Sequence, residues 1–404
     1  MKPSLEVADI FRAFGPAYRE VHGHEMPVRH LRAMRAIEIC RTVELGGHID
    51  QCDHGGALRI SYNSCRNRHC PKCQSLEKER WLEARKKDLL PTSYFHPVFT
   101  LPEGLRPLTL RNQELIYSLL FKAASETLTE LANDPKHLGV EIGFMAILHT
   151  WSQTLIDHPH LHCLVTGGGL SPDGKRWISS KKDFFIPVKA LSRLFRGKFL
   201  DGLKKVYEAG ELRFVGQIEP LKEAPAFKKL LTDLYHQEWV VHCEPPFKNP
   251  QKVIDYLGRY THRVALSNDR LVKMEGTRVT FRWRDSVDNN KIKLLTLEAF
   301  EFIRRFLFHV LPDHFVKIRY YGILSHRSLK GKLLRCKKLL GVSTDKEPQD
   351  VPEETWEDLL TRITGIDPRV CPHCGKGKMV WKEILSVCSV GLTDRMPLQT
   401  GCPP

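Results

Sequence analysis

The pattern of apolar residues predicts a mixed body of strands and helices between residues 94 and 340. Three apolar stretches have the length of strands. The second and third of them, Val140–Thr150 and Leu161–Thr166, are joined by a short link around Asp157 and are therefore expected to be neighbours in a sheet. Three shorter strands are expected between Leu271 and Leu297. The longer strands are Tyr94–Leu101, Val140–Thr150 and Leu161–Thr166.

Helices are predicted where apolar residues recur at helical intervals. The longest such stretch carries Leu115, Leu119 and Leu128. After the third strand, the glycines and polar residues of GGGLSPDGKRW predict a turn-rich segment. The expected helices are Ser75–Leu90, Arg111–Asn133, Lys189–Tyr207, Ala226–Val241, Asn249–Val264 and Glu298–Val310.

Composition divides the 404 residues into three parts. Residues 1–92 hold a region rich in Cys and His followed by a helix, and residues 93–340 form the mixed body. Residues 341–404 begin with a polar, acidic linker and end in a small tail that bears cysteines. The apolar content of 42% is sufficient for cores in two or three domains.

Positive charge is concentrated in one part of the chain. The formal net charge is +15, and residues 245–340 contain 21 Lys and Arg against eight Asp and Glu, a local balance of +13. A folded surface tolerates such self-repulsion best when a polyanion covers it, so we expect nucleic acid as the partner.

Other classes of protein are disfavoured by what the sequence lacks. No apolar run has the length of a membrane span, and the first residues carry Glu6 and Asp9 where a signal peptide would be apolar, so a cytoplasmic protein is expected. No GxxxxGK[ST] motif is present, which argues against an ATPase and against a nucleotide cofactor.

The cysteines of the first part have the spacing of zinc ligands. Cys65, Cys70 and Cys73 lie in NSCRNRHCPKC, and Cys52 lies upstream. Disulfides are disfavoured in a reducing compartment, and a small polar region needs a metal to hold its shape. We therefore expect these four thiols to bind structural zinc. Further candidates, which could complete a second zinc site, are Cys40, His48, His54 and His69.

Two other features accompany these cysteines. Arg66 and Arg68 belong to the same cysteine-bearing loop and are expected to contact DNA phosphates, although a protein contact is an alternative for this region. Cys371 and Cys374 form a second CxxC near the end of the chain, which is expected to be half of a zinc ribbon.

The sequence HPHLHCLV places histidines at every second position of the third strand. His160 and His162 therefore point to one face of an apolar strand, where an unpaired imidazole would be costly. A divalent metal satisfies both, whereas two core histidines bonded to backbone carbonyls are the alternative. The third ligand is expected among His149, Gln153, Asp157 and His158, and we select Gln153.

The segment YLGRYTHRVALSN places two tyrosines on one face of a predicted basic helix. Tyr256 and Tyr260 are four residues apart, which is about one helical turn. Tyrosine can act as a covalent nucleophile, and nearby cations favour its phenolate. Core packing is the alternative for such a pair, but the basic neighbours favour an encounter with phosphate. These neighbours are Arg259, His262 and Arg263.

The ordered motifs NSCRNRHCPKCQ, HPHLHCLVTGGGLSPDG and YLGRYTHRVALSN resemble those of insertion sequence 91-type rolling-circle transposases. The resemblance implies an α+β fold: a two-tyrosine HUH-endonuclease core, in which helices flank a central antiparallel sheet, with an N-terminal zinc-binding domain. His160 and His162 match the metal-binding pair of this family, and Tyr256 and Tyr260 match its nucleophiles. Relatives have a further cysteine after Cys52, where this chain has Asp53-His54-Gly55-Gly56.

The resemblance also implies an activity. Such an enzyme, with Mg²⁺ or Mn²⁺ at the histidines, nicks single-stranded DNA at the ends of its element, forms a 5′-phosphotyrosine link and releases a 3′-OH. It would act at the nucleoid, with the host replication machinery as a further partner. Two alternatives stay open: a plasmid-type replication initiator or relaxase, which shares the chemistry, and a non-catalytic zinc-finger DNA-binding protein.

Overall fold

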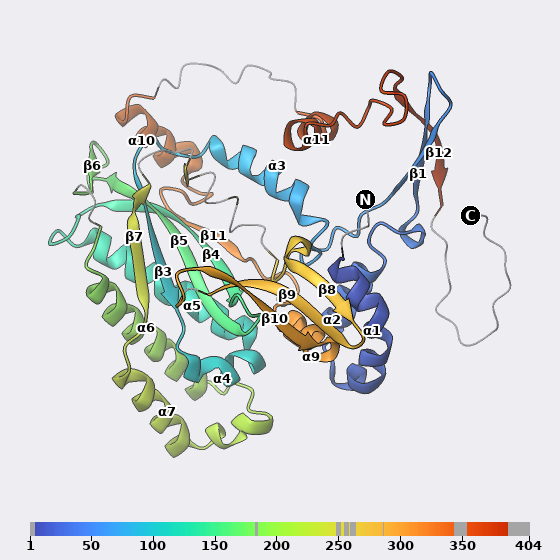
Figure 1. Ribbon diagram of the computed structural model, residues 1–404. Helices are drawn as coiled ribbons and strands as arrows, with labels where there is room; N and C mark the ends of the chain where they lie inside the picture. The colour runs from blue at the N-terminus through green and yellow to red at the C-terminus, as the bar shows by residue number, and fades with distance from the viewer. Residues whose placement is uncertain are drawn as a thin grey trace.

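The computed structural model describes residues 5–181, 185–247, 252–253, 258, 264–285, 287–342 and 354–386, with residues 74–76 described by their backbone alone. Its largest sheet has the strand order β11-β4-β5-β3-β7, and every described pair in it is antiparallel (Figure 1). β5, which carries His160 and His162, is the middle strand of this order. The strands are β3 (Tyr94–Thr100), β4 (Glu141–Trp151), β5 (Asp157–Leu170), β7 (Val241–Phe247) and β11 (Ile318–Gly322), with β6 (Trp177–Ser179) paired to the end of β5.

Helices cover both faces of this main sheet. On one face, Phe121 of α5 and Phe195 of α6 belong to the same buried cluster as Phe144 and Leu161 of the sheet. On the other face, Leu82 of α3 packs with a smaller apolar cluster of the sheet. The predicted α+β arrangement of an antiparallel sheet with flanking helices is thereby confirmed. The helices around this sheet are α3 (Gln74–Lys86), α4 (Arg106–Arg111), α5 (Gln113–Asn133), α6 (Val188–Glu208), α7 (Ala224–His236) and α10 (Leu334–Leu339).

The glycines after the His-Leu-His motif continue the strand, contrary to the predicted turn. Gly167, Gly168 and Gly169 belong to β5, which ends at Leu170. A Cβ at Gly167 would collide with Ser93, and a Cβ at Gly169 would collide with the backbone of β4. These glycines therefore let neighbouring segments of the protein approach the central strand closely, which is one of the uses of glycine in strands.

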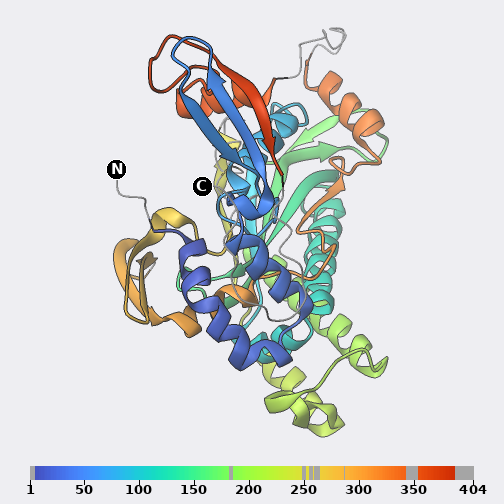
Figure 2. The same cartoon turned by 90° about the vertical axis from the view of Figure 1, so that its right-hand side faces the viewer.

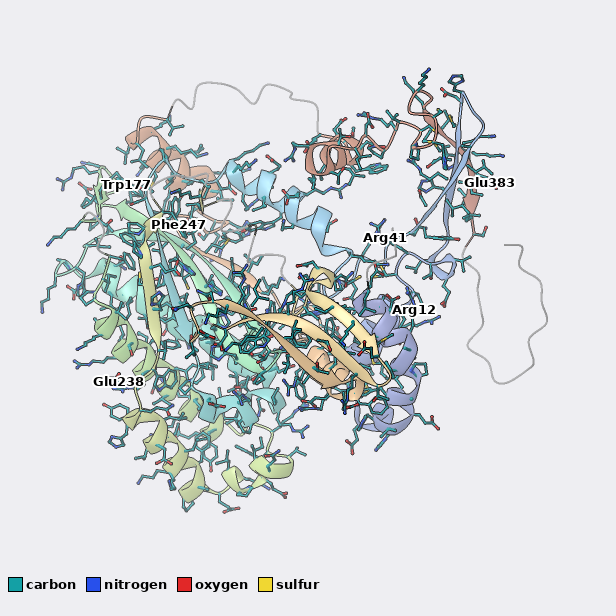
Figure 3. The ribbon with its side chains drawn as sticks, viewed as in Figure 1. Arg12, Arg41, Trp177, Glu238, Phe247 and Glu383 are labelled. Carbon is teal, nitrogen blue, oxygen red and sulfur yellow. The ribbon has the colours of Figure 1, made fainter. Side chains whose placement is uncertain are left out.

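Two edge strands were not predicted. The helix expected to run to Val241 ends at His236, and Val241 begins β7, which pairs with β3. β11 pairs with β4 at the opposite edge. Figure 3 shows Trp177 of β6 and Phe247 of β7 at the same end of this sheet, with Glu238, just before β7, at the other.

A second unit combines helices from the first 40 residues with residues 271–308 around one apolar core. Its sheet has the order β10-β9-β8, which confirms the three short strands predicted after Leu271. Phe11 of α1 lies 5.3 Å from Phe306 of α9 between ring centroids, in an edge-on contact. The elements are α1 (Val7–His22), α2 (Val28–Glu38), β8 (Leu271–Glu275), β9 (Arg278–Asp285), β10 (Lys291–Glu298) and α9 (Ala299–Phe308).

A small third sheet joins the N-terminal and C-terminal parts of the chain. β1 (Gly47–Cys52) pairs with β2 (Leu58–Tyr62) on one side and with β12 (Met379–Leu385) on the other. In Figures 1 and 2 these strands lie side by side and project away from the main sheet. Residues 354–386 also contribute α11 (Trp356–Thr364), whose Arg362 forms an ion pair with Glu83 of α3. The domain boundaries at residues 92 and 340 stay predictions, and packing crosses both of them.

Candidate metal centres

Three histidines converge at the centre of the main sheet. His149 lies on β4 directly opposite His160 of β5, and His162 lies two residues further along β5. One ring nitrogen of each lies within 4.8 Å of one from each of the others. His149 and His162 are buried, while His160 is half-buried. Adjacent strands thus bring three imidazoles together on one face, and these residues could hold a divalent ion.

Further contacts orient two of these rings. Nδ1 of His160 lies 2.7 Å from the carbonyl oxygen of His158. Nδ1 of His162 lies 2.9 Å from Nε2 of His96, a buried residue of β3. The carboxylate of Glu244 lies 3.5 Å from Nδ1 of His96 and favours a proton there. Burial nevertheless lowers the pKa of His96 to about 4, so this ring is neutral near pH 7.

The structure distinguishes among the residues considered for the third ligand. His149 joins the histidine group. Gln153, the selected residue, lies after β4, where its backbone carbonyl accepts a hydrogen bond of 2.6 Å from Arg270, and its role as a ligand stays a prediction. His158 is exposed. His96 was not predicted at all, because one histidine in an apolar strand gives no indication of its neighbour across the sheet.

Asp157, the remaining residue considered, has an unusual environment. It is the first residue of β5 and is 4% exposed. Neither of its carboxylate oxygens has a hydrogen-bond partner among the described residues. Burial raises its pKa to about 7, and the nearby Arg106 offsets this only in part. The carboxyl group of Asp157 is therefore partly protonated at neutral pH.

Four cysteines form the first thiol cluster. They are Cys40, Cys65, Cys70 and Cys73, whose sulfur atoms all lie within 4.8 Å of one another. The Sγ atom of Cys73 lies 3.5 Å from that of Cys40 and 3.5 Å from that of Cys65. These separations are far longer than a disulfide bond of about 2 Å. They are close to the edge of about 3.8 Å that a tetrahedron of thiolates around zinc would have with Zn–S bonds of about 2.3 Å.

This cluster corrects the predicted grouping at one position. Cys40, which was expected in a second site, takes the place of Cys52. Cys40 lies just after α2, and the packing of Met34 and Ile37 of that helix in the same apolar cluster carries it to the other three thiols. The spacing along the chain could not show this, because the contact depends on how α2 docks.

Cys52 belongs to a different cluster, with Cys371 and Cys374. The predicted second set of Cys40, His48 and His54 is therefore not assembled. His48 lies 3.6 Å from Asp50, its neighbour on the same face of β1, and His54 is exposed.

The cysteine-bearing loop also connects the N-terminal region to the main body. Arg68 donates hydrogen bonds of 2.6 Å and 2.5 Å to the backbone carbonyls of Phe315 and Pro312. Two of its donors are therefore used within the protein. Arg66 is exposed and has a positive φ of 52°. The predicted contacts of both arginines with DNA stay predictions.

The predicted nucleophiles lie outside the described residues. They and their basic neighbours are Tyr256, Tyr260, Arg259, His262 and Arg263. Around them the structure describes Lys252, Val253 and Gly258, all helical. Val253 is fully buried in the same cluster as Met145, Ile147 and Leu164 of the main sheet.

The structure is an α+β protein in which one group of three histidines and two groups of cysteines could each hold a metal ion. Two family models match the chain: "Transposase zinc-binding domain" over residues 10–101 and "Putative transposase" over residues 143–331. "Putative transposase y4qJ" of Sinorhizobium fredii is 51% identical, over 94% of this chain and 95% of its own length. "Transposase for insertion sequence element IS801" of Pseudomonas savastanoi pv. phaseolicola is 28% identical, over 87% and 83%.

The chain therefore belongs to the insertion sequence 91-type transposases, with the zinc-binding domain of that family at its N-terminus. No solved structure matches it significantly. The four-cysteine cluster lies within the matched zinc-binding domain, whose name agrees with the predicted structural zinc. Within the described part of the chain, no helix has both the length and the apolar character required to cross a membrane.

Proposed function

We propose that this transposase nicks and rejoins single-stranded DNA at the ends of its insertion element, with Tyr256 and Tyr260 as nucleophiles and a metal ion at the histidine group. The observation that carries the proposal is the convergence of His149, His160 and His162 on one face of the central sheet. Together with membership of a transposase family, this group supports a metal-binding centre for DNA chemistry.

Three imidazole nitrogens suit a divalent transition-metal ion such as Mn²⁺, and with Mg²⁺ the oxygens of water and of the DNA phosphate would supply the other ligands. His96 and the His158 carbonyl engage the Nδ1 atoms of His162 and His160, so these rings would bind the ion through Nε2. Such contacts fix the orientation of the rings before a metal binds. A bound divalent ion would polarise a non-bridging oxygen of the scissile phosphate.

The proposed reaction is a transesterification. The phenolic oxygen of a tyrosine attacks the scissile phosphorus, a new O–P bond forms, and the bond from phosphorus to the 3′ oxygen breaks. The phenol loses its proton, and the departing 3′ oxygen gains one. The products are a 5′-phosphotyrosine link and a free 3′-OH. A second tyrosine would allow the protein to hold one end while it cuts or joins another.

The surroundings of Val253 and Gly258 support a role for the tyrosine segment at this centre. Val253 packs with Ile147, which is paired with His162 across the sheet. A Cβ at Gly258 would lie 3.1 Å from Leu82 of α3. These two residues flank Tyr256 in the sequence and belong to the layer that packs on the histidine face.

The positive charge of residues 245–340 supports a nucleic-acid substrate, since phosphate neutralises such charge. Rejoining the cut strand needs no nucleotide, because the phosphotyrosine link conserves the energy of the broken bond. Replication of the displaced strand would be supplied by the host replication machinery, which we propose as a partner.

The test is cleavage of a labelled single-stranded element end with Mn²⁺, read as a covalent protein–DNA adduct on a denaturing gel. We expect Tyr256→Phe and Tyr260→Phe each to reduce complete strand transfer, whereas Tyr235→Phe, at an exposed tyrosine of α7, leaves it unchanged. His162→Ala should abolish the adduct, and His236→Ala, at an exposed histidine of the same helix, should not. Absence of any adduct with the unmodified protein would show a non-catalytic DNA-binding protein instead.

A further inference from the structure

The small sheet of β1, β2 and β12 has no apolar core of its own. None of its residues, all of which the structure describes, belongs to a buried apolar cluster. Large apolar side chains on it are instead accessible to solvent: Trp381 is 60% exposed and Ile384 is 71% exposed. Three short strands with little buried apolar surface are marginal in water, so another interaction must hold β12 on β1.

Three cysteines lie where this interaction is needed. Cys52 ends β1, and Cys371 and Cys374 precede β12. All three sulfur atoms lie within 4.8 Å of one another, and the Sγ atoms of Cys52 and Cys374, 322 residues apart in sequence, are separated by 3.6 Å. This separation fits an edge of a zinc tetrahedron and exceeds a disulfide bond of about 2 Å. This cluster is separate from the histidine group, and in Figure 1 the paired strands β1 and β12 lie away from β4 and β5 of the main sheet.

The backbone around these thiols stabilises their anionic form. The N–H of Gly55 donates to Sγ of Cys52 over 3.3 Å, and the N–H of Gly377 donates to Sγ of Cys374 over 3.3 Å. In each case the donor follows its cysteine by three residues. Hydrogen bonds to a charged acceptor favour its ionised state, and zinc binds thiolates, not thiols. Two turns of the same form thus face each other across the cluster.

The packing of the two turns leaves no room for a side chain at Gly377. A Cβ there would lie 2.5 Å from Sγ of Cys52 and 2.8 Å from Oδ1 of Asp53. The carboxylate of Asp53 already accepts a hydrogen bond of 2.7 Å from the N–H of Lys378. The turn before β12 is therefore fitted closely against the turn after β1.

We propose that Cys52, Cys371 and Cys374 bind a second structural zinc ion, which fastens residues 354–386 to the zinc-binding domain. Cys371 and Cys374 are separated by two residues, and the equivalent partner of Cys52 would be residue 55, which is glycine here. Among the residues that the structure describes, the site therefore has three thiolates, and no fourth cysteine joins them. The inference is independent of the proposed nicking activity.

Gly55 offers a direct way to test this geometry. A Cβ built there meets no atom within 4 Å, and its φ lies outside the left-handed region. Gly55→Cys can therefore add a fourth thiol without a collision. We expect this variant to release its second zinc to a chelator at least tenfold more slowly than the unmodified protein. Gly56, with a φ of +68°, is the wrong place for such a change, so Gly56→Cys is the matched control and should not slow release.

The main experiment measures zinc in the full chain by mass spectrometry and protection of backbone amides from hydrogen exchange. Cys371→Ser should hold one zinc ion fewer than the unmodified protein and lose amide protection in β12, with β4 and β5 unchanged. Cys243→Ser removes a thiol of β7 that belongs to neither described cluster, and it should retain all zinc. Unchanged zinc in folded Cys371→Ser, or a Cys52–Cys374 disulfide in the purified protein, would overturn the proposal.

Discussion

The main sheet and the small sheet of β1, β2 and β12 are both antiparallel, yet they are held together in different ways. Along β5, nearly every residue is buried, and the sheet packs between helices on both faces. Along β12, five of seven residues are exposed. Burial of apolar surface stabilises the first sheet, whereas cysteines from two distant parts of the chain meet at one end of the second. A continuous apolar pattern therefore predicts one kind of sheet and overlooks the other.

The largest expected effect comes from disrupting the cluster of Cys40, Cys65, Cys70 and Cys73. The result would show whether the region around a bound zinc ion and the main sheet, which is stabilised by burial, unfold independently. Cys70→Ser should release one zinc ion and abolish amide protection of the cysteine-bearing loop, because binding of structural zinc contributes on the order of 10 kcal/mol to folding. The amides of β4 and β5 should stay protected. Hydrogen exchange and zinc content measure both results. Loss of protection in β5 as well would contradict the separation of the two regions.

The converse change weakens the main sheet and leaves the metals in place. Phe144 of β4 is fully buried, between the sheet and its helices. Phe144→Ala should lower the free energy of unfolding of the body by about 4 kcal/mol, since it removes apolar contacts and leaves a cavity. Zinc content should not change. Thermal unfolding with parallel zinc measurement checks this, and zinc loss from the folded variant would show that the clusters depend on the core.

Within the main sheet, burial of the Asp157 carboxylate lowers the stability of the folded protein when that group is ionised, so the effect depends on pH. Because its folded pKa is raised to about 7, its contribution to stability is complete below about pH 4 and is lost as the pH rises through 7. Asp157→Asn should therefore stabilise the protein at pH 8, by on the order of 3 kcal/mol, and change little at pH 4. The difference in melting temperature between variant and parent, followed from pH 4 to 8, measures this. A constant difference across that range would exclude ionisation of Asp157 as its origin.

The same contrast explains how much could be predicted from the sequence. The apolar runs identified β3, β4 and β5, and the alternation in HPHLHCLV placed His160 and His162 on one face of the central strand. Buried strands can be predicted from the local sequence, because successive side chains alternate between the two faces of the sheet. The prediction of a turn at Gly167–Gly169 was wrong because these glycines make room for Ser93 and for the backbone of β4. The local sequence pattern does not show these neighbours.

What the sequence could not supply were contacts between distant segments. Cys52 was assigned to the cysteines nearest in sequence, whereas its partners, Cys371 and Cys374, lie more than 300 residues away. His96 was overlooked for the same reason, since only the pairing of β3 with β5 brings it to His162. Spacing along the chain identifies ligands that belong to one loop or strand. The other ligands are brought to a site only when separate elements dock, and spacing does not show this.

The smallest expected effect concerns such a distant contact in the main sheet. His96 touches no proposed metal directly and is a positioning residue: its Nε2 lies 2.9 Å from Nδ1 of His162. His96→Gln should weaken binding of Mn²⁺ at the histidine group about tenfold, because a neighbouring group that orients a ligand typically contributes this much. Titration of Mn²⁺ followed by electron paramagnetic resonance measures the affinity.

The matched control is His326→Gln, an exposed histidine that lies against Tyr320 at the edge of the sheet. It should bind Mn²⁺ as the unmodified protein does. Because the ligands themselves remain in His96→Gln, a higher concentration of Mn²⁺ should restore DNA cleavage, whereas His162→Ala should not be restored. Equal Mn²⁺ affinity in His96→Gln and the unmodified protein would mean that β5 alone orients the ring of His162. The docking of β3 on β5 would then not be needed to complete the metal centre. Each thiol cluster, in contrast, is completed only when separate segments of the chain dock.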